Sequence, residues 1–326
     1  MNGTIVGVLR GGPSREHEVS LATGAAIMAN LDTKRYTVRD IYIDRAGVWH
    51  ERGLPVLPEK ALRTLDVAVI GLHGEYGEDG EVQKVLERFG IPYTGSDSFA
   101  SFVAMHKVLS KEKAKEHGLK TARYVFIEEE SDVDSMLAEV VRTYPQPVVV
   151  KPVRWGSSVG VSLVAGFAPL QSAVKSLLEQ GAGGVLVEEY IRGVEATAGV
   201  VEGLRGEGLY HLPPIEIRPP AGAEFFDRQV KYSGETEEIC PARFPRNIME
   251  ELSLHAATMH GALGLRHYSR SDFIVSPKGI YYLETNTLPG LTPHSLLPKS
   301  LTAVGMAFPD FLSYLIDLAL QTKHRA

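Results

Sequence analysis

Two acids and an amide near the end of the chain have the residue types of a divalent-metal site. Asp272, Glu284 and Asn286 offer oxygen ligands. Such ligands suit Mg²⁺, which usually completes its shell with water and substrate phosphates. Segments 268–275 and 280–286, which contain these residues, are rich in apolar and aromatic side chains and predict two strands. The sequence therefore predicts a metal site that faces a polyphosphate.

The turn between these strands decides whether the side chains meet. The four residues of the connection favour a turn, and a three-residue loop with Gly279 in the left-handed conformation is a common hairpin closure. That loop places Asp272 opposite Glu284. It also places Arg270 opposite Asn286 on the same face, because side chains alternate along a strand. Opposed acids destabilise a sheet, and a cation between them removes that objection. The alternative is an exposed hairpin rim with solvated acids.

The first third of the chain must position further groups. Strand and helix patterns alternate there, which predicts an open parallel sheet covered by helices. The expected strands are 5–9, 36–43 and 67–70. The expected helices are 19–31 and 82–89. Ligands bind beyond the carboxyl ends of strands in such sheets. Glu16 and His73 follow strands closely, so we expect both at that crevice.

A lysine and a glycine-serine loop form a second candidate site. Lys151 closes a run of three valines, and a buried ammonium needs an anionic partner. The following loop, 156–160, offers backbone N–H groups and the Ser157 hydroxyl, which suit phosphate. The Walker spacing is absent. A plain hairpin end explains the loop equally well.

Further charged residues lie around these segments. Lys107 opens a predicted helix, 106–117, and a solvated helix face explains its other lysines, Lys111, Lys113 and Lys115. Glu188 and Glu195 flank a predicted strand end at a spacing that could receive an adenosine. Surface acids are the alternative reading of that pair.

Two loops complete the candidate residues. Segment 224–242 is long, polar and aromatic without a clear period, and such loops are usually functional or disordered. Its aromatic residues argue against disorder, so we expect a lid that contains Lys231 and Tyr232. Segment 289–296 reads as a turn whose amides and Ser295 hydroxyl could bind a carboxylate. A plain turn is the alternative.

Composition limits the class of protein. The 326 residues suggest two or three domains, and 44% hydrophobic with 23% charged residues is ordinary for a soluble globular chain. The net charge of −6 argues against a nucleic-acid partner. The chain contains no apolar run long enough for a membrane span, and its N-terminus lacks the charged region of a secretion signal. The single cysteine, Cys240, excludes an intrachain disulfide. We therefore expect a cytoplasmic protein.

In order and spacing, these segments resemble the D-alanine–D-alanine ligases of the ATP-grasp superfamily. The motifs that carry the resemblance are Gly-Gly-Pro-Ser-Arg-Glu-His-Glu-Val-Ser at 11–20, 72–80, 92–96, Lys-Pro at 151–152, Gly-Ser-Ser-Val-Gly at 156–160, Lys-Tyr at 231–232, 240–242, Glu-Thr-Asn-Thr-Leu-Pro-Gly at 284–290, and 294–296. Each motif is weak or moderate alone. The ordered set is highly specific and extends over nearly the whole chain.

The resemblance implies an ATP-grasp fold of class α/β, with α+β character in the C-terminal two thirds, made of three domains of which the first is a pre-ATP-grasp domain. The expected domains are a Rossmann-like sheet over 1–97, a central subdomain with the phosphate loop over 98–190, and a C-terminal subdomain with the metal site and lid over 191–326. The implied reaction phosphorylates one D-alanine to an acylphosphate, which a second D-alanine amine attacks. ADP and phosphate are released, and the dipeptide serves peptidoglycan synthesis. A homodimer and dependence on a monovalent cation such as K⁺ are also implied.

The resemblance also implies roles for individual residues. ATP is held by Lys107, Lys151, Lys231 and Ser157 and, at the adenosine, by Glu188 and Glu195. Two Mg²⁺ ions, replaceable by Mn²⁺, bind Asp272, Glu284 and Asn286. The first D-alanine's ammonium meets Glu16, with His73 nearby. The oxyanion and the second carboxylate meet Arg270, Gly290, Ser295 and Leu296. A hydrogen-bonded link that shuts the lid consists of Glu16, Ser157 and Tyr232.

Three positions depart from the family pattern. His106 stands where Asp is common, Trp155 where Glu or a small residue is frequent, and Glu189 where Lys is frequent beside the adenine. Two rival functions remain at this stage. One is a ligase with D-lactate or D-serine as acceptor, although the Lys231–Tyr232 pair is typical of the dipeptide-forming type. The other is a nucleotide-binding regulator without catalysis, against which the intact metal and arginine set argues.

Overall fold

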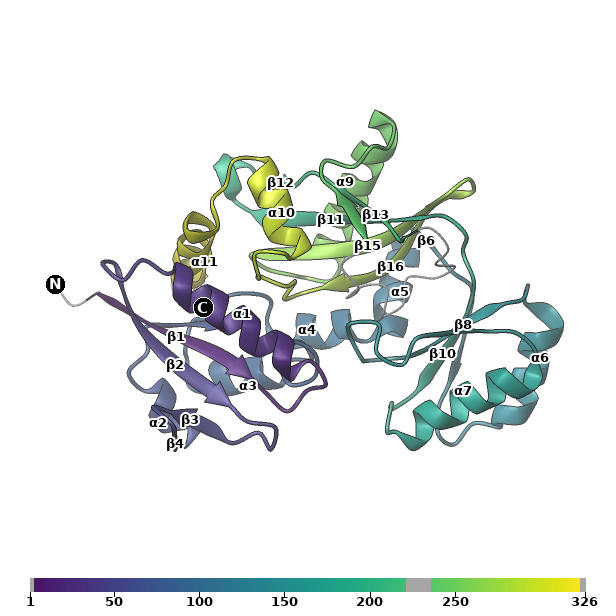
Figure 1. The fold of residues 1–326 in the computed structure, drawn as a ribbon, viewed down its shortest axis with the longest axis horizontal. Coiled ribbons are helices and arrows are strands. Elements are labelled where there is room, and N and C mark those ends of the chain that lie inside the picture. Colours follow the sequence, from purple (N-terminus) through teal and green to yellow (C-terminus); the bar gives the residue numbers. More distant parts are fainter. Residues whose placement is uncertain (1–2, 221–235, 323–326) are drawn as a thin grey trace.

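Three sheets make up the computed structural model, which describes residues 3–220 and 236–322 (Figure 1). The strand orders are β4-β3-β2-β1-β5 in the N-terminal sheet, β7-β10-β8-β9 in the central sheet and β14-β13-β11-β15-β16-β6 in the C-terminal sheet, with β12 paired to β11. Helices pack against all three sheets, so the expected mixed α/β class is confirmed.

The N-terminal sheet has a parallel centre, as expected. Its strands are β1 (Thr4–Gly11), β2 (Tyr36–Ile43), β3 (Trp49–Glu51), β4 (Leu54–Pro55) and β5 (Val67–Ile70), and its helices are α1 (His17–Asn30), α2 (Pro58–Leu62) and α3 (Glu81–Arg88). Strand β1 pairs in parallel with β2 and β5, while β3 and β4 add an antiparallel edge. The carboxyl ends of β1 and β5 therefore open at one edge, where Glu16 and His73 follow them.

The central sheet is antiparallel, with both of its helices packed together. Its elements are β7 (Tyr124–Ile127), α6 (Val133–Thr143), β8 (Val148–Pro152), β9 (Ser162–Val164), α7 (Phe167–Glu179) and β10 (Val185–Glu189). Its core includes Leu137, Val140, Leu170 and Val174, all fully buried. Two helices and a short strand precede it: α4 (Ser98–Met105), α5 (Lys107–Glu116) and β6 (Lys120–Thr121). Strand β6 joins the C-terminal sheet beside β16.

The C-terminal sheet is built around two long antiparallel strands. Its elements are β11 (Val194–Glu202), η1 (Leu204–Gly206), β12 (Leu209–His211), β13 (Ile215–Arg218), β14 (Glu237–Ile239), α9 (Arg246–Ala262), β15 (Tyr268–Ser276), β16 (Gly279–Asn286), α10 (Leu296–Ala303) and α11 (Phe308–Thr322). Strands β12 and β13 are separate, because Pro213 and Pro214 between them lack the N–H groups that a continuous ladder needs. The turn expected over 289–296 leads into α10, which the sequence reading missed.

The hairpin of β15 and β16 has the predicted pairing at Asp272 and Arg270, but the predicted turn and the predicted pairing next to the turn are wrong. Ser276 pairs with Gly279, so the loop has two residues and the three-residue expectation is wrong. The pairing shifts at a bulge beside Asp272, which leaves Leu283 without a partner. Beyond the bulge Asp272 lies opposite Glu284, as expected. A turn shorter by one residue would by itself shift the pairing of the two strands and move Glu284 to the other face of the sheet. The extra residue in the bulge reverses that shift, so Asp272 and Glu284 still lie opposite each other.

Helix α11 closes the molecule by packing back on the N-terminal sheet. Phe311, Leu315 and Ile316 share one buried cluster with Val6 and Val69. Among the described residues no single helix is long and apolar enough to cross a membrane, although the bent pair of α10 and α11 reaches the required length and composition together.

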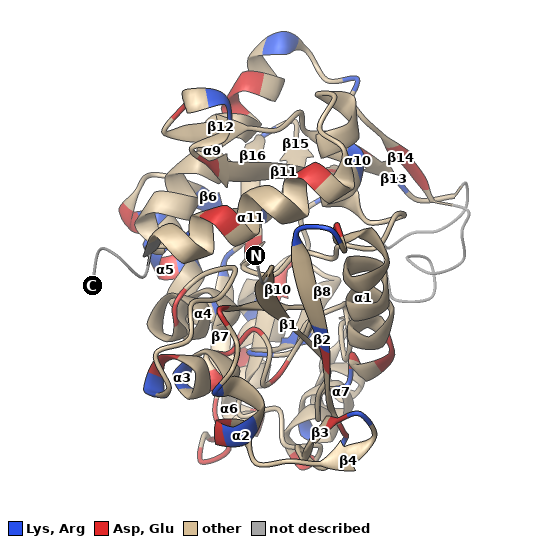
Figure 2. Ribbon diagram, turned by 90° about the vertical axis from the view of Figure 1, so that its left-hand side faces the viewer, with Lys and Arg blue, Asp and Glu red and all other residues tan. Residues whose placement is uncertain are grey.

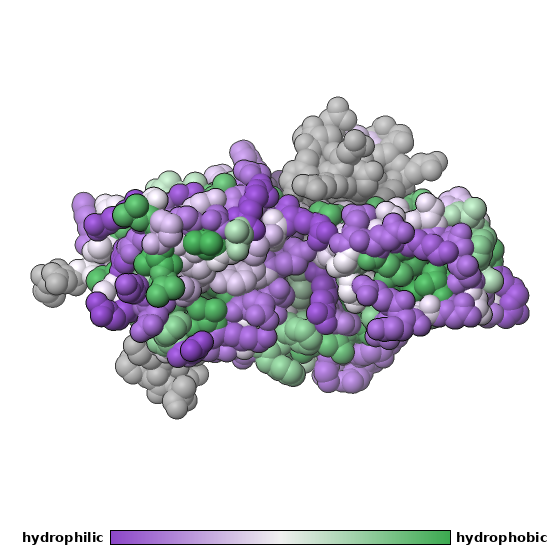
Figure 3. Space-filling view, turned by 90° about the horizontal axis from the view of Figure 1, so that it is seen from below, coloured by the Kyte–Doolittle hydropathy of each residue, from purple (hydrophilic) through white to green (hydrophobic). Residues whose placement is uncertain are grey.

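The surface mixes charge and polarity. Figure 2 shows acidic and basic residues interspersed over many of the helices and strands. On the face drawn in Figure 3, hydrophilic residues gather across the middle and apolar residues form separate patches. Isolated apolar residues are normal on soluble surfaces.

The packing of α11 predicts a large stability loss on truncation of its central aromatic residue. Phe311 is fully buried and meets the Tyr268 ring edge-on at 5.8 Å between centroids. We expect Phe311→Ala to lower the free energy of unfolding by about 3–5 kcal/mol in urea titrations. Phe99→Ala is the matched control, because Phe99 is 76% exposed. Its change should stay within about 0.5 kcal/mol. Equal losses in both variants would contradict this view of α11.

Candidate active site

A cavity of about 1270 Å³ lies where the three sheets meet. Every site residue expected from the sequence that lies in the described part of the chain lines it: Glu16, His73, Lys107, Lys151, Ser157, Glu188, Glu195, Arg270, Asp272, Glu284, Asn286, Gly290, Ser295 and Leu296. Lys231 and Tyr232 lie outside the described residues. The structure thus brings together groups that are almost 300 positions apart in the chain.

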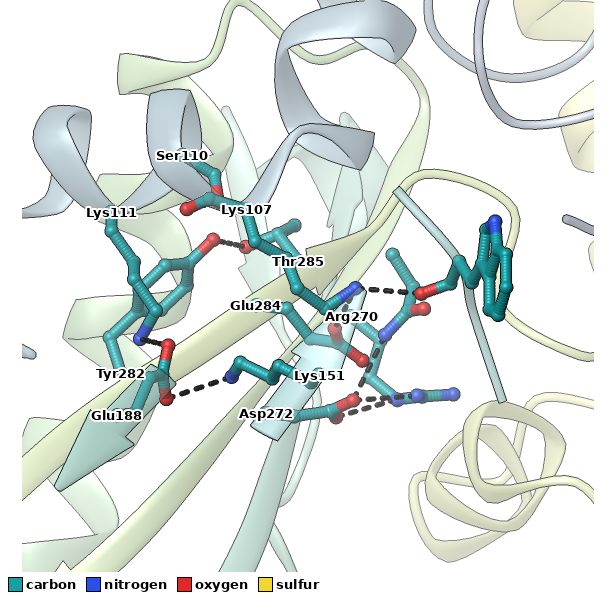
Figure 4. A network of polar contacts seen from close by, with 12 residues as sticks. Lys107, Ser110, Lys111, Lys151, Glu188, Arg270, Asp272, Tyr282, Glu284 and Thr285 are labelled. Atoms are coloured by element: carbon teal, nitrogen blue, oxygen red, sulfur yellow. Dashed lines mark hydrogen bonds and ion pairs between the residues drawn. The ribbon is translucent and has the colours of Figure 1, made fainter. Parts of the chain in front are cut away.

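The hairpin contributes a network of opposed charges (Figure 4). Arg270 donates from Nε and Nη2 to the two carboxylate oxygens of Asp272, at 2.9 Å each. Asn286 Nδ2 donates to Asp272 Oδ2 at 2.9 Å. Glu284 Oε2 lies 3.1 Å from the Lys107 ammonium. The opposed acids therefore each have a cationic partner, which offsets their mutual repulsion.

Arg270 is held in its charged form by this network. Burial disfavours the guanidinium charge, but the neighbouring Asp272 and Glu284 carboxylates outweigh it and raise the pKa of Arg270 above its ordinary value. The side chain is also largely shielded, with 13% of it exposed. A fixed cation therefore stands beside the two acids at the end of the hairpin.

The donor set of the hairpin suits a hard divalent cation. Two carboxylates and an amide share one face, and Thr197 Oγ1 fixes Asp272 by donating to Oδ1 at 2.6 Å. Within residues 3–220 and 236–322, no three His, Cys, Asp or Glu side chains converge as a metal cage. An ion on this face would therefore draw further ligands from water and phosphate, which is the habit of Mg²⁺.

A chain of buried lysines runs from the hairpin to the central sheet. Lys107 Nζ donates to the Trp155 carbonyl at 2.7 Å. Lys151 lies 2.9 Å from Glu188, and Lys111 lies 3.1 Å from the other oxygen of that carboxylate. The anionic partner expected for Lys151 is thus Glu188, and reading Glu188 as a surface acid is wrong, because it is 3% exposed.

Lys111 corrects the expectation of a solvated helix face. Its side chain is fully buried, whereas Lys113 and Lys115 are exposed and form surface pairs with Glu116 and Glu112. Lys111 is four positions after Lys107, so both lie on the face of α5 that packs against β16. That spacing was the signal in the sequence that could have identified it.

Burial shifts the ionisation of this cluster. Burial lowers the pKa of Lys111 to about 8. The Glu188 carboxylate opposes this shift, and the Lys151 ammonium adds to it. Burial alone would raise the pKa of Glu188, but Lys111 and Lys151 together hold it below its ordinary value. At neutral pH the cluster thus keeps one carboxylate between two ammonium groups.

The edge of the N-terminal sheet supplies a buried acid pair. The ring of His73 is fixed by Thr23 Oγ1, 2.7 Å from Nε2. Glu16 lies so close to Gly156 that a Cβ there would sit 2.5 Å from Oε1, which explains the glycine. Glu78, to which we assigned no role from the sequence, accepts from the Gly74 N–H at 3.0 Å. Burial and the nearby Glu16 charge raise the pKa of Glu78 well above its ordinary value, which favours its protonated form.

The glycine-serine loop over 156–160 has an unusual backbone. Ser157 and Ser158 both have positive φ, 54° and 56°. This conformation is uncommon for residues other than glycine, and such strain concentrates at functional sites. The loop lines the cavity opposite the hairpin acids. A plain hairpin end therefore explains it less well than an anion-binding loop.

A helix start faces the cavity from the other side. Ser295 occupies the N-cap position of α10 and makes no side-chain cap there. A Cβ on Gly290 would lie 2.8 Å from the Ser295 hydroxyl oxygen, so the two positions are adjacent. Leu296 begins the helix, whose first N–H groups carry partial positive charge. This arrangement suits a carboxylate.

Comparisons with known proteins agree with this geometry. A family model described as "D-ala D-ala ligase C-terminus" matches residues 114–317, and "D-ala D-ala ligase N-terminus" matches 5–60 and 50–96. The D-alanine–D-alanine ligase of Syntrophobacter fumaroxidans is 42% identical over 317 residues, with 97% of each chain covered. That of Geobacter sulfurreducens is 40% identical over 325 residues, covering 98% of this chain and 96% of the relative.

Solved structures share the same architecture. The Bacillus anthracis D-alanine–D-alanine ligase complexed with ATP has a TM-score of 0.81 at 31% identity, covering 99% of each chain. The VanG D-Ala:D-Ser ligase of Enterococcus faecalis has a TM-score of 0.85 at 29% identity, covering 98% of this chain and 100% of that one. The ATP-grasp fold expected from the sequence is confirmed. The chain belongs to the D-alanine–D-alanine ligase family and is a ligase.

Proposed function

We propose that this ligase joins two D-alanines into D-alanyl-D-alanine through an acylphosphate, with release of ADP and phosphate, for peptidoglycan precursor synthesis. The observation that carries the proposal is the shared cavity, in which lysines, opposed acids and a helix start face one another. The proposal includes a cytoplasmic homodimer with domains over 1–97, 98–190 and 191–326. It also includes K⁺ or a similar monovalent ion as an activator.

The buried lysines suit the triphosphate. Phosphoryl transfer depends mainly on positioning and charge neutralisation. Lys107 and Lys151 reach the cavity from different elements, and the strained loop at Ser157 adds backbone N–H groups. Lys231 is proposed for the same task on the grounds of the resemblance alone. Glu188 forms an ion pair with Lys151. Glu188 and Glu195 both line the cavity, where we expect them to contact the adenosine.

The hairpin acids would hold two Mg²⁺ ions, or Mn²⁺, at the phosphates. Bound there, the metal neutralises charge on the transferring group. Asp272, Glu284 and Asn286 would supply the oxygen ligands of the metal from one face of the hairpin. Lys107 would then leave Glu284 and contact phosphate. The chain's own contribution is thus a rigid oxygen face on a two-stranded frame.

The amino acids are held from the other two sides. Glu16 meets the ammonium of the first D-alanine, with His73 alongside. Arg270 and the Gly290 N–H stabilise the tetrahedral oxyanion, and Ser295 with the α10 start receives the second carboxylate. Leu296 provides an apolar contact for a methyl group. Closure of a lid by Glu16, Ser157 and Tyr232 excludes water, which would otherwise hydrolyse the acylphosphate.

Two departures from the family pattern have local explanations. Glu189 accepts from the Arg123 N–H at 3.0 Å, so its carboxylate is engaged at the strand end. His106 is the N-cap of α5 and accepts from the Leu109 N–H at 3.4 Å, a task that an Asp side chain also performs. Neither removes a group that the proposed reaction needs.

The acceptor is the point at which a second function competes. The similarity to a D-Ala:D-Ser ligase favours considering D-serine, whereas the Lys231–Tyr232 pair favours D-alanine. A phosphate-release assay with ATP and Mg²⁺ decides between them, run with D-alanine, D-serine, D-lactate and L-alanine and with products weighed by mass spectrometry. We expect D-alanyl-D-alanine with D-alanine. Nucleotide binding without phosphate release would instead support a regulator.

Removal of Arg270 should separate binding from chemistry. We expect Arg270→Ala to reduce kcat for dipeptide formation by about 100- to 1000-fold, because one oxyanion donor is lost. MgADP affinity, measured by calorimetry, should change little. Arg246→Ala is the control, since Arg246 is exposed and pairs with Glu250 on the surface. Undiminished turnover in Arg270→Ala would rule out its oxyanion role.

The pKa of Lys111 predicts a pH dependence of nucleotide binding. Its charge is present below about pH 8 and is lost as the pH rises further, so positive potential in the cavity falls. We expect MgADP affinity to weaken by about three- to tenfold between pH 7 and 9. Lys111→Met should show the weaker affinity already at pH 7 and little further change.

Lys113→Met provides the matched control for this titration. Lys113 is on the same helix but exposed, so its variant should follow the wild-type pH profile. Calorimetric titrations at four pH values would measure both variants. An unchanged pH profile in Lys111→Met would show that another group titrates.

A further inference from the structure

Two loops from different sheets meet at a stacked pair of side chains. The guanidinium carbon of Arg15 lies 3.6 Å from the ring centroid of Trp155. Arg15 follows β1 and directly precedes Glu16, while Trp155 follows β8 and directly precedes Gly156. The next residues along each loop also touch, since Glu16 lies against Gly156. The N-terminal loop and the phosphate loop therefore run together over two consecutive positions.

Arg15 is oriented by contacts on both sides of this junction. Its Nη1 lies 3.3 Å from Glu75 Oε1, in the loop after β5. Its Nη2 donates to the Gln180 carbonyl at 3.3 Å, at the C-terminal end of α7. A cation is favoured at that end of a helix. Thus the Arg15 side chain, from the loop after β1, contacts the part of the chain around the central sheet at both Trp155 and Gln180.

Trp155 is anchored independently of Arg15. It is 6% exposed and belongs to the buried cluster of the central sheet with Leu177. A Cβ on Gly160 would lie 3.2 Å from its ring, so the ring is packed against the far end of the phosphate loop. Its carbonyl accepts from Lys107. A movement of Trp155 therefore moves the loop that contains Ser157.

We propose that Arg15 is a positioning residue that latches the phosphate loop onto the loop of Glu16. The latch brings the first amino acid and the triphosphate into one reactive arrangement. The inference rests on the proposed function, which assigns the amino acid to Glu16 and phosphate to the loop. The latch also accounts for Trp155, which departs from the family pattern. A tryptophan ring offers the aromatic face on which an arginine cation stacks.

The latch affects one substrate more than the other. Loss of the stack lowers the population of the docked arrangement, which weakens apparent binding of the group that needs both loops. The amino acid at Glu16 needs both. MgADP contacts the central and C-terminal sheets, where Trp155 and Lys107 keep their own anchors. The expected signature is therefore a change confined to the first D-alanine.

The kinetic experiment compares Arg15→Met with Arg45→Met in the full-length protein. Arg15→Met should lower kcat/KM for the first D-alanine by about three- to thirtyfold, with the MgADP Kd changed by less than twofold. Arg45 makes an exposed ion pair with Glu18 in the same part of the fold, so its variant should match wild type. Arg15→Lys should recover part of the loss. Unchanged kinetics in Arg15→Met, or an equal loss of MgADP affinity, would overturn the latch.

A fluorescence experiment tests the stack without any catalytic readout. The chain has two tryptophans, so Trp49→Phe leaves Trp155 as the only one, and its emission is followed with excitation that tyrosine does not absorb. In that background Arg15→Met should increase acrylamide quenching of Trp155, because the guanidinium no longer covers the ring. Equal quenching with and without Arg15 would refute the stack. If the wild-type protein formed no dipeptide, the proposed function would fail while the quenching result still decided the contact.

Discussion

The structure depends on pairing each group of like charges in its interior with charges of the opposite sign. Two carboxylates face each other across the β15–β16 hairpin, and three ammonium groups are buried behind them. Each set is stabilised by the opposite charge. Arg270 neutralises Asp272, Lys107 neutralises Glu284, and one carboxylate, Glu188, lies between Lys111 and Lys151. Because each buried charge has a partner of opposite sign, its burial costs less free energy than the burial of an isolated charge would.

A polyphosphate with its cations, the kind of ligand proposed above for this cavity, presents the same alternation of sign. The Lys107–Glu284 pair lies at the cavity wall, where such a ligand would meet it. The deeper Lys111–Glu188 pair, with both side chains almost fully buried, remains as a fixed support.

The sequence was sufficient for the parallel N-terminal sheet and the mixed α/β class, which follow from short-range periodicity. It also predicted the opposition of Asp272 to Glu284, but from a loop length that is wrong. The sequence was insufficient where tertiary contacts decide. The bulge beside Asp272 compensates a shorter turn, and nothing local distinguishes that solution from a regular hairpin with a longer loop. Lys111 and Lys113 have similar neighbours in the chain, and only the four-residue spacing from Lys107 marks Lys111. The packing of α5 on β16 is what makes Lys111 the buried one.

The return of α11 to the N-terminal sheet has a consequence for synthesis of the protein. Val6 and Val69 share their buried cluster with Phe311 and Ile316, which the ribosome adds roughly 240 to 310 residues later. The N-terminal sheet therefore keeps part of its apolar surface uncovered until α11 has been translated. Exposed apolar surface makes a nascent chain prone to aggregation during that interval.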